Sequence, residues 1–302
     1  MDKFVSVIIP VLNNIEGLCQ TLSALDKQTY PSQLYEVIVV DNGSSQDLKS
    51  AIAQFDRARL SYEECPGSYI ARNQGISIAK GEILAFTDSD CIPEPDWLAN
   101  GVKCLSSVDN CGLVAGKINF FYQNPQRPTT VELYDRATFL NQKKYIEQYR
   151  YGATANMFTW KKVVEEVGYF NGELKSGGDK EWGQRVSRHG YILLYSSDTC
   201  IAHPARSSWQ EISQKIARTR MGGYEVDRLS SQSKLLFYGR KLLTIIWRLK
   251  PPTKSALEKL KECDRSLTVI QKIKLLGAIL AIHYQGAWVE IEMYFKNLKY
   301  IF

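Results

Sequence analysis

The first 115 residues or so alternate between two patterns of apolar and polar positions. Strand-like apolar and β-branched runs lie at 5–9, 36–40, 60–62 and 83–86. Helix-like stretches lie between and after them, at about 15–27, 45–55, 69–79 and 96–107. Such alternation is typical of βαβ units, and continuous apolar strands are those that helices cover on both faces. The pattern therefore predicts an α/β fold with a Rossmann-like, mainly parallel central sheet flanked by helices.

Beyond about residue 115 the alternation fades and helical patterns dominate. The next expected elements are a loop at 125–130, a helix at 131–149, a strand at 154–158, a helix at 160–167, a helix from Asp179 to Gly190 and a strand at 191–195. From Trp209 onward the pattern predicts helices alone, interrupted at Pro251-Pro252. We therefore expect two domains, a main α/β domain at 1–220 and a helical C-terminal extension at 221–302.

The positive charge of the chain is concentrated near its C-terminus. A formal net charge of +6 over 302 residues is too mild to indicate a nucleic-acid partner. However, no acidic residue stands between Asp227 and Glu258, and residues 234–250 combine Leu, Ile and Trp with five basic side chains. Basic amphipathic helices of this kind lie in membrane interfaces. The same pattern also suits a helix that packs on the main domain with a solvated basic face, and both interpretations stay open here.

Other features favour a cytoplasmic protein, at the inner face of the cell membrane if the basic segment binds lipid. The first residues lack the positive start and apolar core of a signal peptide. The most apolar stretch, 275–289, is too short to cross a bilayer. The seven cysteines are odd in number and form no CxxC pair, which favours free thiols in a reducing compartment over disulfides or a zinc site.

Polar residues follow the predicted strands at the edge where open α/β sheets bind ligands. They are Asn13-Asn14, Asp41-Asn42-Gly43-Ser44-Ser45 and Asp88-Ser89-Asp90. Two carboxylates at positions i and i+2, where a buried strand ends, can meet at one point and hold Mg²⁺. The alternatives are an ordinary capped βα loop at Asp41 and a pair of acids at 88–90 that only complement a helix dipole.

Three further residues are candidates for chemistry. Asp179 follows two glycines at a predicted helix start, where it serves either as an N-cap or as a general base. His203 follows the strand at 191–195, either as a structural histidine or as an imidazole that completes a carboxylate metal site. Arg72 lies either on a solvated helix face or close enough to pair with a phosphate or with the acids at 88–90.

In this order and spacing the motifs resemble those of family 2 glycosyltransferases of the GT-A fold. The residues that carry the resemblance are Ile8–Asn14, Val39–Ser44, Ala71–Gly75, Ala85–Asp90, Gly178–Trp182 and His203. The match covers roughly residues 4–220, so 1–220 is expected to be a GT-A catalytic domain. The resemblance implies transfer of a sugar from a nucleotide-sugar donor, expected to be a UDP-sugar, to a hydroxyl of a saccharide or lipid-linked acceptor, in polysaccharide or glycolipid synthesis.

The resemblance also implies roles for particular positions. The residues implied to bind the nucleotide sugar are Pro10, Val11, Asn13, Asp41, Asn42, Arg72, Asp88 and Ser89. Asp90 and His203 are implied to hold Mg²⁺ or Mn²⁺, and Asp179 matches the base that deprotonates the acceptor hydroxyl. One base and a metal-stabilised diphosphate leaving group suit a direct displacement with inversion at the anomeric carbon. Gly178 departs from the family pattern, which commonly has Glu before the base.

Three rival classes fit the sequence less well. A sugar-1-phosphate nucleotidyltransferase would want a Gly-rich loop with Lys or Arg after the first strand, but residues 10–17 contain neither cation. A catalytically silent nucleotide-sugar binder should have lost the acids, yet Asp88, Asp90 and Asp179 are all present. A Rossmann dehydrogenase would show GxGxxG after the first strand, and this motif is missing there.

Overall fold

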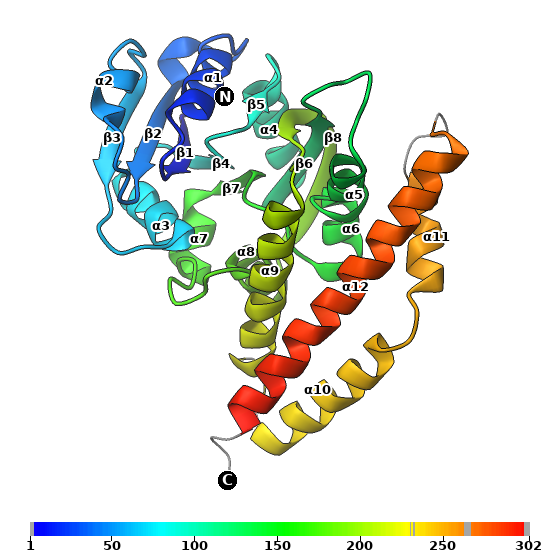
Figure 1. The fold of residues 1–302 in the computed structure, drawn as a ribbon. Helices are drawn as coiled ribbons and strands as arrows, with labels where there is room; N and C mark the ends of the chain where they lie inside the picture. The colour runs from blue at the N-terminus through cyan, green and yellow to red at the C-terminus, as the bar shows by residue number, and fades with distance from the viewer. Residues whose placement is uncertain (1–2, 230, 232, 263–266, 299–302) are drawn as a thin grey trace. The chain divides into compact units, whose positions relative to one another are not determined.

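The computed structural model describes residues 3–229, 231, 233–262 and 267–298 (Figure 1). In this part of the chain, eight strands form one sheet in the order β3-β2-β1-β4-β7-β6-β8-β5. The strands are β1 (Val5–Val11), β2 (Tyr35–Asp41), β3 (Ala58–Tyr62), β4 (Ile83–Thr87), β5 (Ile92–Pro93), β6 (Cys111–Phe121), β7 (Asn156–Trp160) and β8 (Ile192–Pro204). The helices are α1 (Ile15–Leu25), α2 (Leu48–Ile52), α3 (Ser68–Ile78), α4 (Trp97–Leu105), α5 (Thr130–Thr138), α6 (Gln142–Lys144), α7 (Lys161–Val167), α8 (Gly178–Arg188), α9 (Trp209–Leu229), α10 (Lys234–Arg248), α11 (Thr253–Glu262) and α12 (Val269–Leu298). A short 3-10 turn (Ser32–Leu34) and a π-helical turn (Tyr145–Tyr149) complete the set.

The sheet has a parallel half and an antiparallel half. Strand β1 pairs in parallel with β2 and β4, and β2 pairs in parallel with β3. Strand β4 then pairs antiparallel with β7, β7 with β6, and β5 with β8. Helix α3 packs on β1 and β2, and α4 packs on β7 and β8 (Figure 1). The expected α/β fold, with helices flanking a central sheet and a helical C-terminal region, is confirmed.

The structure differs from the expected elements at three places. Strand β6 was not expected, because Gly112, Gly116 and Lys117 interrupt its apolar pattern. Strand β8 runs far beyond the predicted 191–195, since its middle is polar and so carries no strand signal. The helix predicted at 131–149 is interrupted at Leu140, which has a left-handed backbone (φ 57°). For β6 and β8, pairing with neighbouring strands outweighs the local pattern.

Buried Asn156 shows how the antiparallel half is held together. Its Oδ1 accepts a hydrogen bond of 2.8 Å from the indole N–H of Trp97. Its Nδ2 donates to the backbone carbonyls of Lys117 and Thr199, both at 2.9 Å. Because both polar atoms of this amide are hydrogen-bonded, β7 is fixed against β6 and β8 without leaving Asn156 unpaired in the core. Gly116 permits this approach, since a Cβ there would lie 2.3 Å from the Thr199 carbonyl.

The chain divides into two compact units. Unit 1 runs to Phe120 and resumes from Leu140 to Pro204, and unit 2 comprises Phe121–Phe139 and the chain from Ala205 onward. The core of unit 1 is built from β-branched side chains of the parallel strands and from Leu and Trp of α1 and α4. The core of unit 2 joins α5 to α9, α11 and α12. The expected domain boundary at residue 220 lies inside α9 and stays a prediction.

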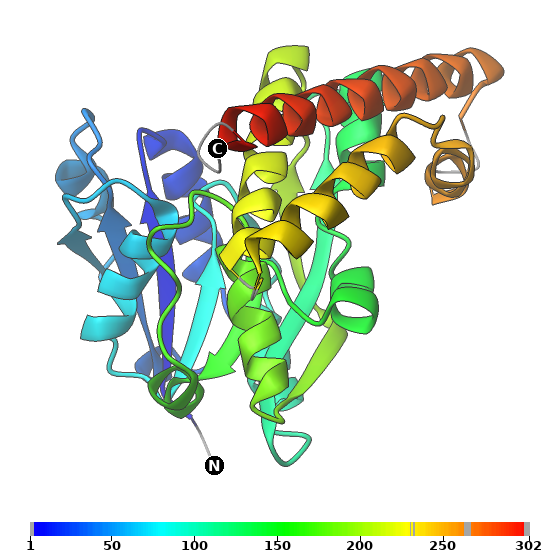
Figure 2. The ribbon, with the colours of Figure 1, turned by 90° about the horizontal axis from the view of Figure 1, so that it is seen from below.

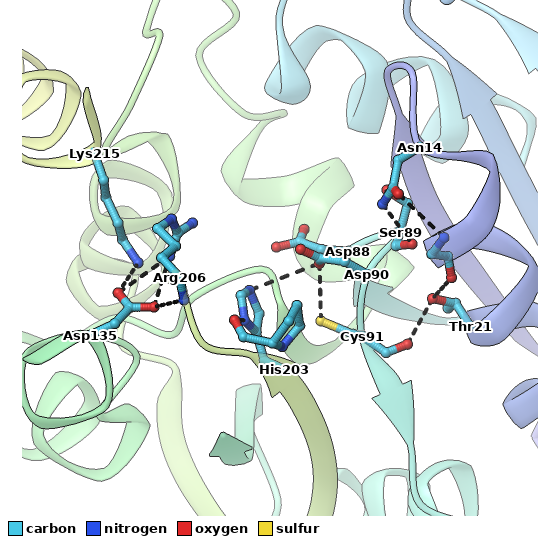
Figure 3. Close-up of polar contacts among 12 residues, drawn as sticks. Asn14, Thr21, Asp88, Ser89, Asp90, Cys91, Asp135, His203, Arg206 and Lys215 are labelled. Carbon is cyan, nitrogen blue, oxygen red and sulfur yellow. Dashed lines mark hydrogen bonds and ion pairs between the residues drawn. The ribbon is translucent and has the colours of Figure 1, made fainter. Parts of the chain in front are cut away.

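Unit 2 contains a buried charge cluster around Asp135 (Figure 3). Asp135 is fully buried and pairs with Arg206 at 3.3 Å and with Lys215 at 3.5 Å. The Lys215 ammonium also lies 3.9 Å from the centre of the Phe139 ring. Burial lowers the pKa of Lys215 to about 7, and the Asp135 carboxylate opposes this shift. The two cations therefore compensate a carboxylate that could not be buried alone.

The C-terminal helices of unit 2 are amphipathic. Ser233 caps α10, with its hydroxyl accepting from the N–H of Leu236. Helices α10 and α12 pack beside each other (Figure 2). Among the described residues, no helix is both long enough and apolar enough to span a bilayer. Six of the cysteines are free thiols, and Cys263 lies outside the described residues.

Candidate functional site

The loop after β4 brings two carboxylates to a histidine from the far end of the sheet. Asp88 and Asp90 lie between β4 and β5, and β5 pairs antiparallel with β8 so that Ile92 is opposite Ala202. This register carries His203 to the acidic loop. Ligand atoms of Asp88, Asp90, Cys91 and His203 all lie within 4.8 Å of one another (Figure 3). Tertiary structure thus unites two motifs that are far apart in the sequence.

The ring of His203 is held in one orientation by its neighbour in the chain. Its ring is buried, and Nδ1 lies 2.7 Å from the Pro204 carbonyl oxygen. Because a carbonyl can only accept, Nδ1 donates the hydrogen, and Nε2 is the ring nitrogen left to face the acidic loop. Nε2 lies 3.9 Å from Oδ1 of Asp90. A backbone acceptor on the remote ring nitrogen is the usual means by which proteins orient a metal-binding imidazole.

The donor set fits a hard divalent cation. Two carboxylates and one neutral imidazole suit Mg²⁺ or Mn²⁺, whereas thiolates suit softer metals. Cys91 is fully buried, burial raises the pKa of its thiol well above the usual value, and its carbonyl accepts from the Thr21 hydroxyl at 2.7 Å. Cys91 therefore packs as a small apolar side chain at the base of the cluster, and the three other residues are the candidate ligands.

Arg72 connects the acidic loop to α3. Its Nη2 lies 2.5 Å from Oδ1 of Asp88, and its Nη1 donates to the Ser68 carbonyl at 3.2 Å. The side chain is almost entirely buried, so this is no solvated helix face. Within the described part of the chain its Nε has no hydrogen-bond partner. The guanidinium therefore fixes the position of Asp88 and adds positive charge beside the acidic loop.

Asp179 lies in the first turn of α8 and is held by two donors. The backbone N–H of Lys180 donates to Oδ1 at 2.9 Å, and the Tyr69 hydroxyl donates to the same oxygen at 3.2 Å. Burial raises the pKa of the Asp179 carboxyl above its usual value, and these donors oppose the shift. A carboxylate with a raised pKa is a stronger base near neutral pH than a solvated one.

The ring of Tyr69 explains why glycine precedes Asp179. A Cβ at Gly178 would lie 2.7 Å from Cε2 of Tyr69, closer than a real side chain allows. The Tyr69 ring stacks on Phe170 with centroids 5.9 Å apart, and the Arg72 guanidinium lies 5.9 Å from the ring centre. In this chain an aromatic ring therefore occupies space next to the residue where the family commonly has Glu.

The predicted residues at the first two strand ends serve partly as scaffold. Pro10 and Val11 are buried, and the Val11 carbonyl accepts from the N–H of Asn42. Oδ1 of Asp41 accepts from the N–H of Ser44 at 2.9 Å, which shapes the βα loop. Asn13 has a left-handed backbone (φ 52°), and its Oδ1 accepts two hydrogen bonds from Ser45. These contacts join the two loops to each other.

The side chain of Asn42 forms hydrogen bonds to three backbone groups of the protein. Its Nδ2 donates to the carbonyls of Glu63 and Cys65, at 3.0 and 2.7 Å, and its Oδ1 accepts from the N–H of Gly67 at 2.7 Å. The side chain thus holds the loop that leads into α3, the helix that bears Tyr69 and Arg72. Its contacts are those of a positioning residue.

Two residues of the site were missed by sequence reasoning. Tyr69 was not singled out because nothing in its local pattern indicates a partner 110 residues away. Asn14 was noted only as part of a motif, yet its Nδ2 donates to the carbonyl of Ser89 at 3.1 Å and lies 3.2 Å from the Ser89 hydroxyl. Its Oδ1 also caps α1 by accepting from the N–H of Gly17. Asn14 thereby ties the acidic loop to the start of α1.

Comparison with solved structures identifies the fold. The structure is similar to that of the mannosyltransferase PcManGT from Pyrobaculum calidifontis, solved with GDP-Man and Mn²⁺, with a TM-score of 0.62 and 20% identity over 97% of this chain and 85% of that one. At this identity the likeness shows the fold alone, which is that of a GT-A glycosyltransferase.

Sequence comparison gives the family. The profile described as Glycosyl transferase family 2 matches residues 6–168, more than half of the chain. The glycosyltransferase AglE of Haloferax volcanii is 37% identical over 278 residues, 90% of each chain. An Escherichia coli enzyme named UDP-Glc:alpha-D-GlcNAc-diphosphoundecaprenol beta-1,3-glucosyltransferase is 32% identical over 126 residues, 41% of this chain and 46% of that one. The chain belongs to glycosyltransferase family 2, and it is a glycosyltransferase.

We expect the Tyr69 hydroxyl to lower the pKa of the Asp179 carboxyl. In a Tyr69→Phe variant the carboxylate loses a donor that favours its ionised form, so its pKa rises further. The ionised base is then lost at higher pH, and the acid limb of kcat/KM for transfer moves to higher pH. A pH–rate profile measures this shift, with Tyr284→Phe as a control that removes an exposed hydroxyl from α12. A uniform loss of rate at every pH would instead assign Tyr69 a purely structural role.

Proposed function

We propose that this glycosyltransferase is inverting and metal-dependent, and that it transfers a sugar from a nucleoside-diphosphate sugar to a hydroxyl acceptor. The observation that carries the proposal is the convergence of Asp88, Asp90 and His203 at one point. Asp179 supports it as a separate carboxylate with a raised pKa. Tyr69 and Arg72, on one helix, connect these two acidic sites.

The donor is expected to lie across the carboxyl ends of the parallel strands. Asp41 and Asn13 would face the nucleoside from the loops after β2 and β1, with Pro10 and Val11 forming the floor. Asn42 would act by holding the loop before α3. The Arg72 guanidinium lies beside Asp88, where its positive charge would favour the phosphates of the donor. Ser89, held by Asn14, would present its backbone to the same ligand.

Asp90 and His203 would hold the Mg²⁺ or Mn²⁺ ion, with Asp88 beside them. When bound, such an ion offsets the negative charge that develops on the departing diphosphate. Asp88 is paired with Arg72, on the side of the cluster that faces α3. Asp90 instead has its Oδ1 3.9 Å from Nε2 of His203, and this closeness to the imidazole supports Asp90 as the ligand, with Asp88 helping to place the donor.

Asp179 would act as the general base. It takes the proton of the acceptor hydroxyl as the oxygen attacks the anomeric carbon, and the bond to the diphosphate breaks with its electron pair leaving on the phosphate oxygen. The proton ends on the Asp179 carboxylate, whose raised pKa favours its retention. A single displacement of this kind needs no second nucleophilic carboxylate and inverts the anomeric configuration.

We further propose a UDP-sugar donor and a saccharide or lipid-linked acceptor, in polysaccharide or glycolipid synthesis on the cytoplasmic side. Support comes from the Escherichia coli relative, whose name specifies UDP-Glc and a diphosphoundecaprenol-linked acceptor. The similar mannosyltransferase structure contains GDP-Man, so a GDP-sugar is the alternative that the experiment must include.

A thermal-shift screen of UDP- and GDP-sugars with Mn²⁺ tests the donor and the metal together. A ligand that binds only the folded state stabilises it by RT ln(1 + [L]/Kd), about 2.7 kcal/mol at one hundred times Kd. We expect one nucleotide sugar to raise the melting temperature by several degrees with Mn²⁺ and to lose most of this effect in EDTA. No shift with any nucleotide sugar, or an equal shift in EDTA, would contradict the proposal. The anomeric configuration of the product, read by NMR, tests inversion.

A further inference from the structure

Helix α10 has a covered apolar face and an exposed one. On the covered face Phe237 and Ile245 are buried, and Phe237 packs edge-on against Tyr224 with ring centroids 5.1 Å apart. Residues three, four and seven apart share a helix face. The exposed apolar face of α10, as defined by this spacing, consists of Leu235, Leu236, Leu242, Leu243, Ile246 and Trp247. Leu235 is 84% exposed, and Leu243 and Trp247 are each 68% exposed, so this is a surface without a cover in the described chain.

The charges around this face are positive. Of the five basic residues at 234–250, Lys241 pairs with Asp227 at 2.7 Å and Arg248 pairs with Glu290. Lys234, Arg240 and Lys250 are exposed and pair with no acid among the described residues. The sequence has no acid from 228 to 257. The structure thus reduces five candidate charges to three that remain for an outside partner.

The neighbouring helix α12 adds to the exposed apolar surface. It packs beside α10 in the same unit, and the Tyr238 hydroxyl of α10 donates to the Asn297 carbonyl of α12 at 3.2 Å (Figure 2). Its exposed large apolar side chains include Val269, Ile270, Ile273, Trp288 and Phe295. Exposed apolar surfaces of this kind mark sites of interaction.

We propose that α10 binds the surface of an anionic lipid bilayer. The helix lies in the plane of the interface, with its leucines and Trp247 at the acyl-chain boundary and its free cations near the headgroups. The charge selects this partner over a second copy of the chain, because two copies meeting at this face would bring like charges together. The helix lies on the membrane without crossing it, in keeping with the lack of a spanning helix in the described chain.

This inference deepens the proposed function, since a lipid-linked acceptor is itself found at such a surface. Binding to vesicles needs neither donor nor metal, so it is tested separately from catalysis. A chain that binds vesicles but no nucleotide sugar would contradict only the proposed donor. A chain that transfers sugar but ignores vesicles would contradict only the membrane proposal.

Flotation of the full chain with vesicles tests the proposal. We expect the wild-type protein to float at low salt with phosphatidylcholine vesicles that contain phosphatidylglycerol, and much less with pure phosphatidylcholine. The double variant Leu243→Gln/Trp247→Gln should bind the anionic vesicles about tenfold more weakly, because it removes two large exposed apolar side chains from the interface. The variant Arg240→Gln/Lys250→Gln removes the two free cations that are spaced with the exposed face, and it should lose most of the dependence on anionic lipid and on salt.

Matched controls make the result decisive. Val108→Gln changes an exposed apolar residue of unit 1 and should bind as the wild type does. All substituted side chains are exposed, so thermal melts should be nearly unchanged. Wild-type protein that stays unbound to anionic vesicles at low salt would overturn the proposal. A wild-type dimer in light scattering that becomes monomeric in Leu243→Gln/Trp247→Gln would also overturn it, because the face would then join two copies.

Discussion

Replacing Asp179 with asparagine is expected to slow sugar transfer by about 10²–10⁴-fold, the usual contribution of a general base. Asparagine keeps the size of the side chain and can still accept from the N–H of Lys180 and the Tyr69 hydroxyl. It cannot take a proton from the acceptor. Donor affinity should therefore stay nearly unchanged, since the candidate metal ligands are untouched. Single-turnover rates measure the first effect and calorimetry of donor binding measures the second.

The pH dependence provides an internal check on this variant. Because burial raises the pKa of Asp179, the acid limb of the wild-type rate should lie above the usual range of a carboxyl group. In the variant this limb should disappear. Wild-type turnover in Asp179→Asn, or a limb that persists unchanged, would show that another group takes the proton.

Stability should change in the opposite direction to activity. A carboxyl group whose folded pKa is raised favours folding below its unfolded pKa and loses this contribution as the pH rises through its folded value. Above its folded pKa, the ionised Asp179 is thus a cost to the folded state. Asp179→Asn should unfold at the same or a slightly higher temperature than the wild type at neutral pH, which separates lost chemistry from lost structure.

Replacing Asp90 with asparagine is expected to weaken the metal-dependent part of donor binding by about 100-fold. The substitution removes one negative oxygen from the cluster with Asp88 and His203 while keeping its shape. Calorimetry with Mn²⁺ and with EDTA separates the two contributions. We expect the variant to match the wild type in EDTA and to gain little from Mn²⁺.

Asp109→Asn is the matched control for Asp90→Asn. It makes the same charge change at an exposed loop position and should preserve the response to Mn²⁺. If Asp90→Asn gains as much from Mn²⁺ as the wild type does, the metal is not held at this cluster. A loss of binding in EDTA as well would instead indicate that Asp90 contacts the donor directly.

The parallel half of the fold could be predicted from the sequence because its signals are local. Strands β1, β2 and β4 are mainly apolar runs, and polar residues begin at their ends or within two residues of them. Parallel strands end at the same sheet edge, so adjacency in sequence placed Asp41 and the acidic loop at one edge. The antiparallel half could not be predicted in this way. Strands β6 and β8 contain polar and glycine positions that give no local strand signal, and these segments are strands because neighbouring strands pair with them.

The candidate site likewise has some features that the local sequence predicts and others that depend on the tertiary structure. By itself the sequence determined which residues follow which strands, and therefore that Asp88 and Asp90 share one loop. Only the tertiary structure decided that Arg72 pairs with Asp88, that Asn42 faces inward to hold a loop, and that Tyr69 reaches Asp179. It also decided, through the register of β5 on β8, that His203 meets Asp90. The physical reason is the separation of the residues along the chain. Hydrophobic periodicity and turn chemistry act over a few residues, whereas these contacts depend on how distant strands pair and pack.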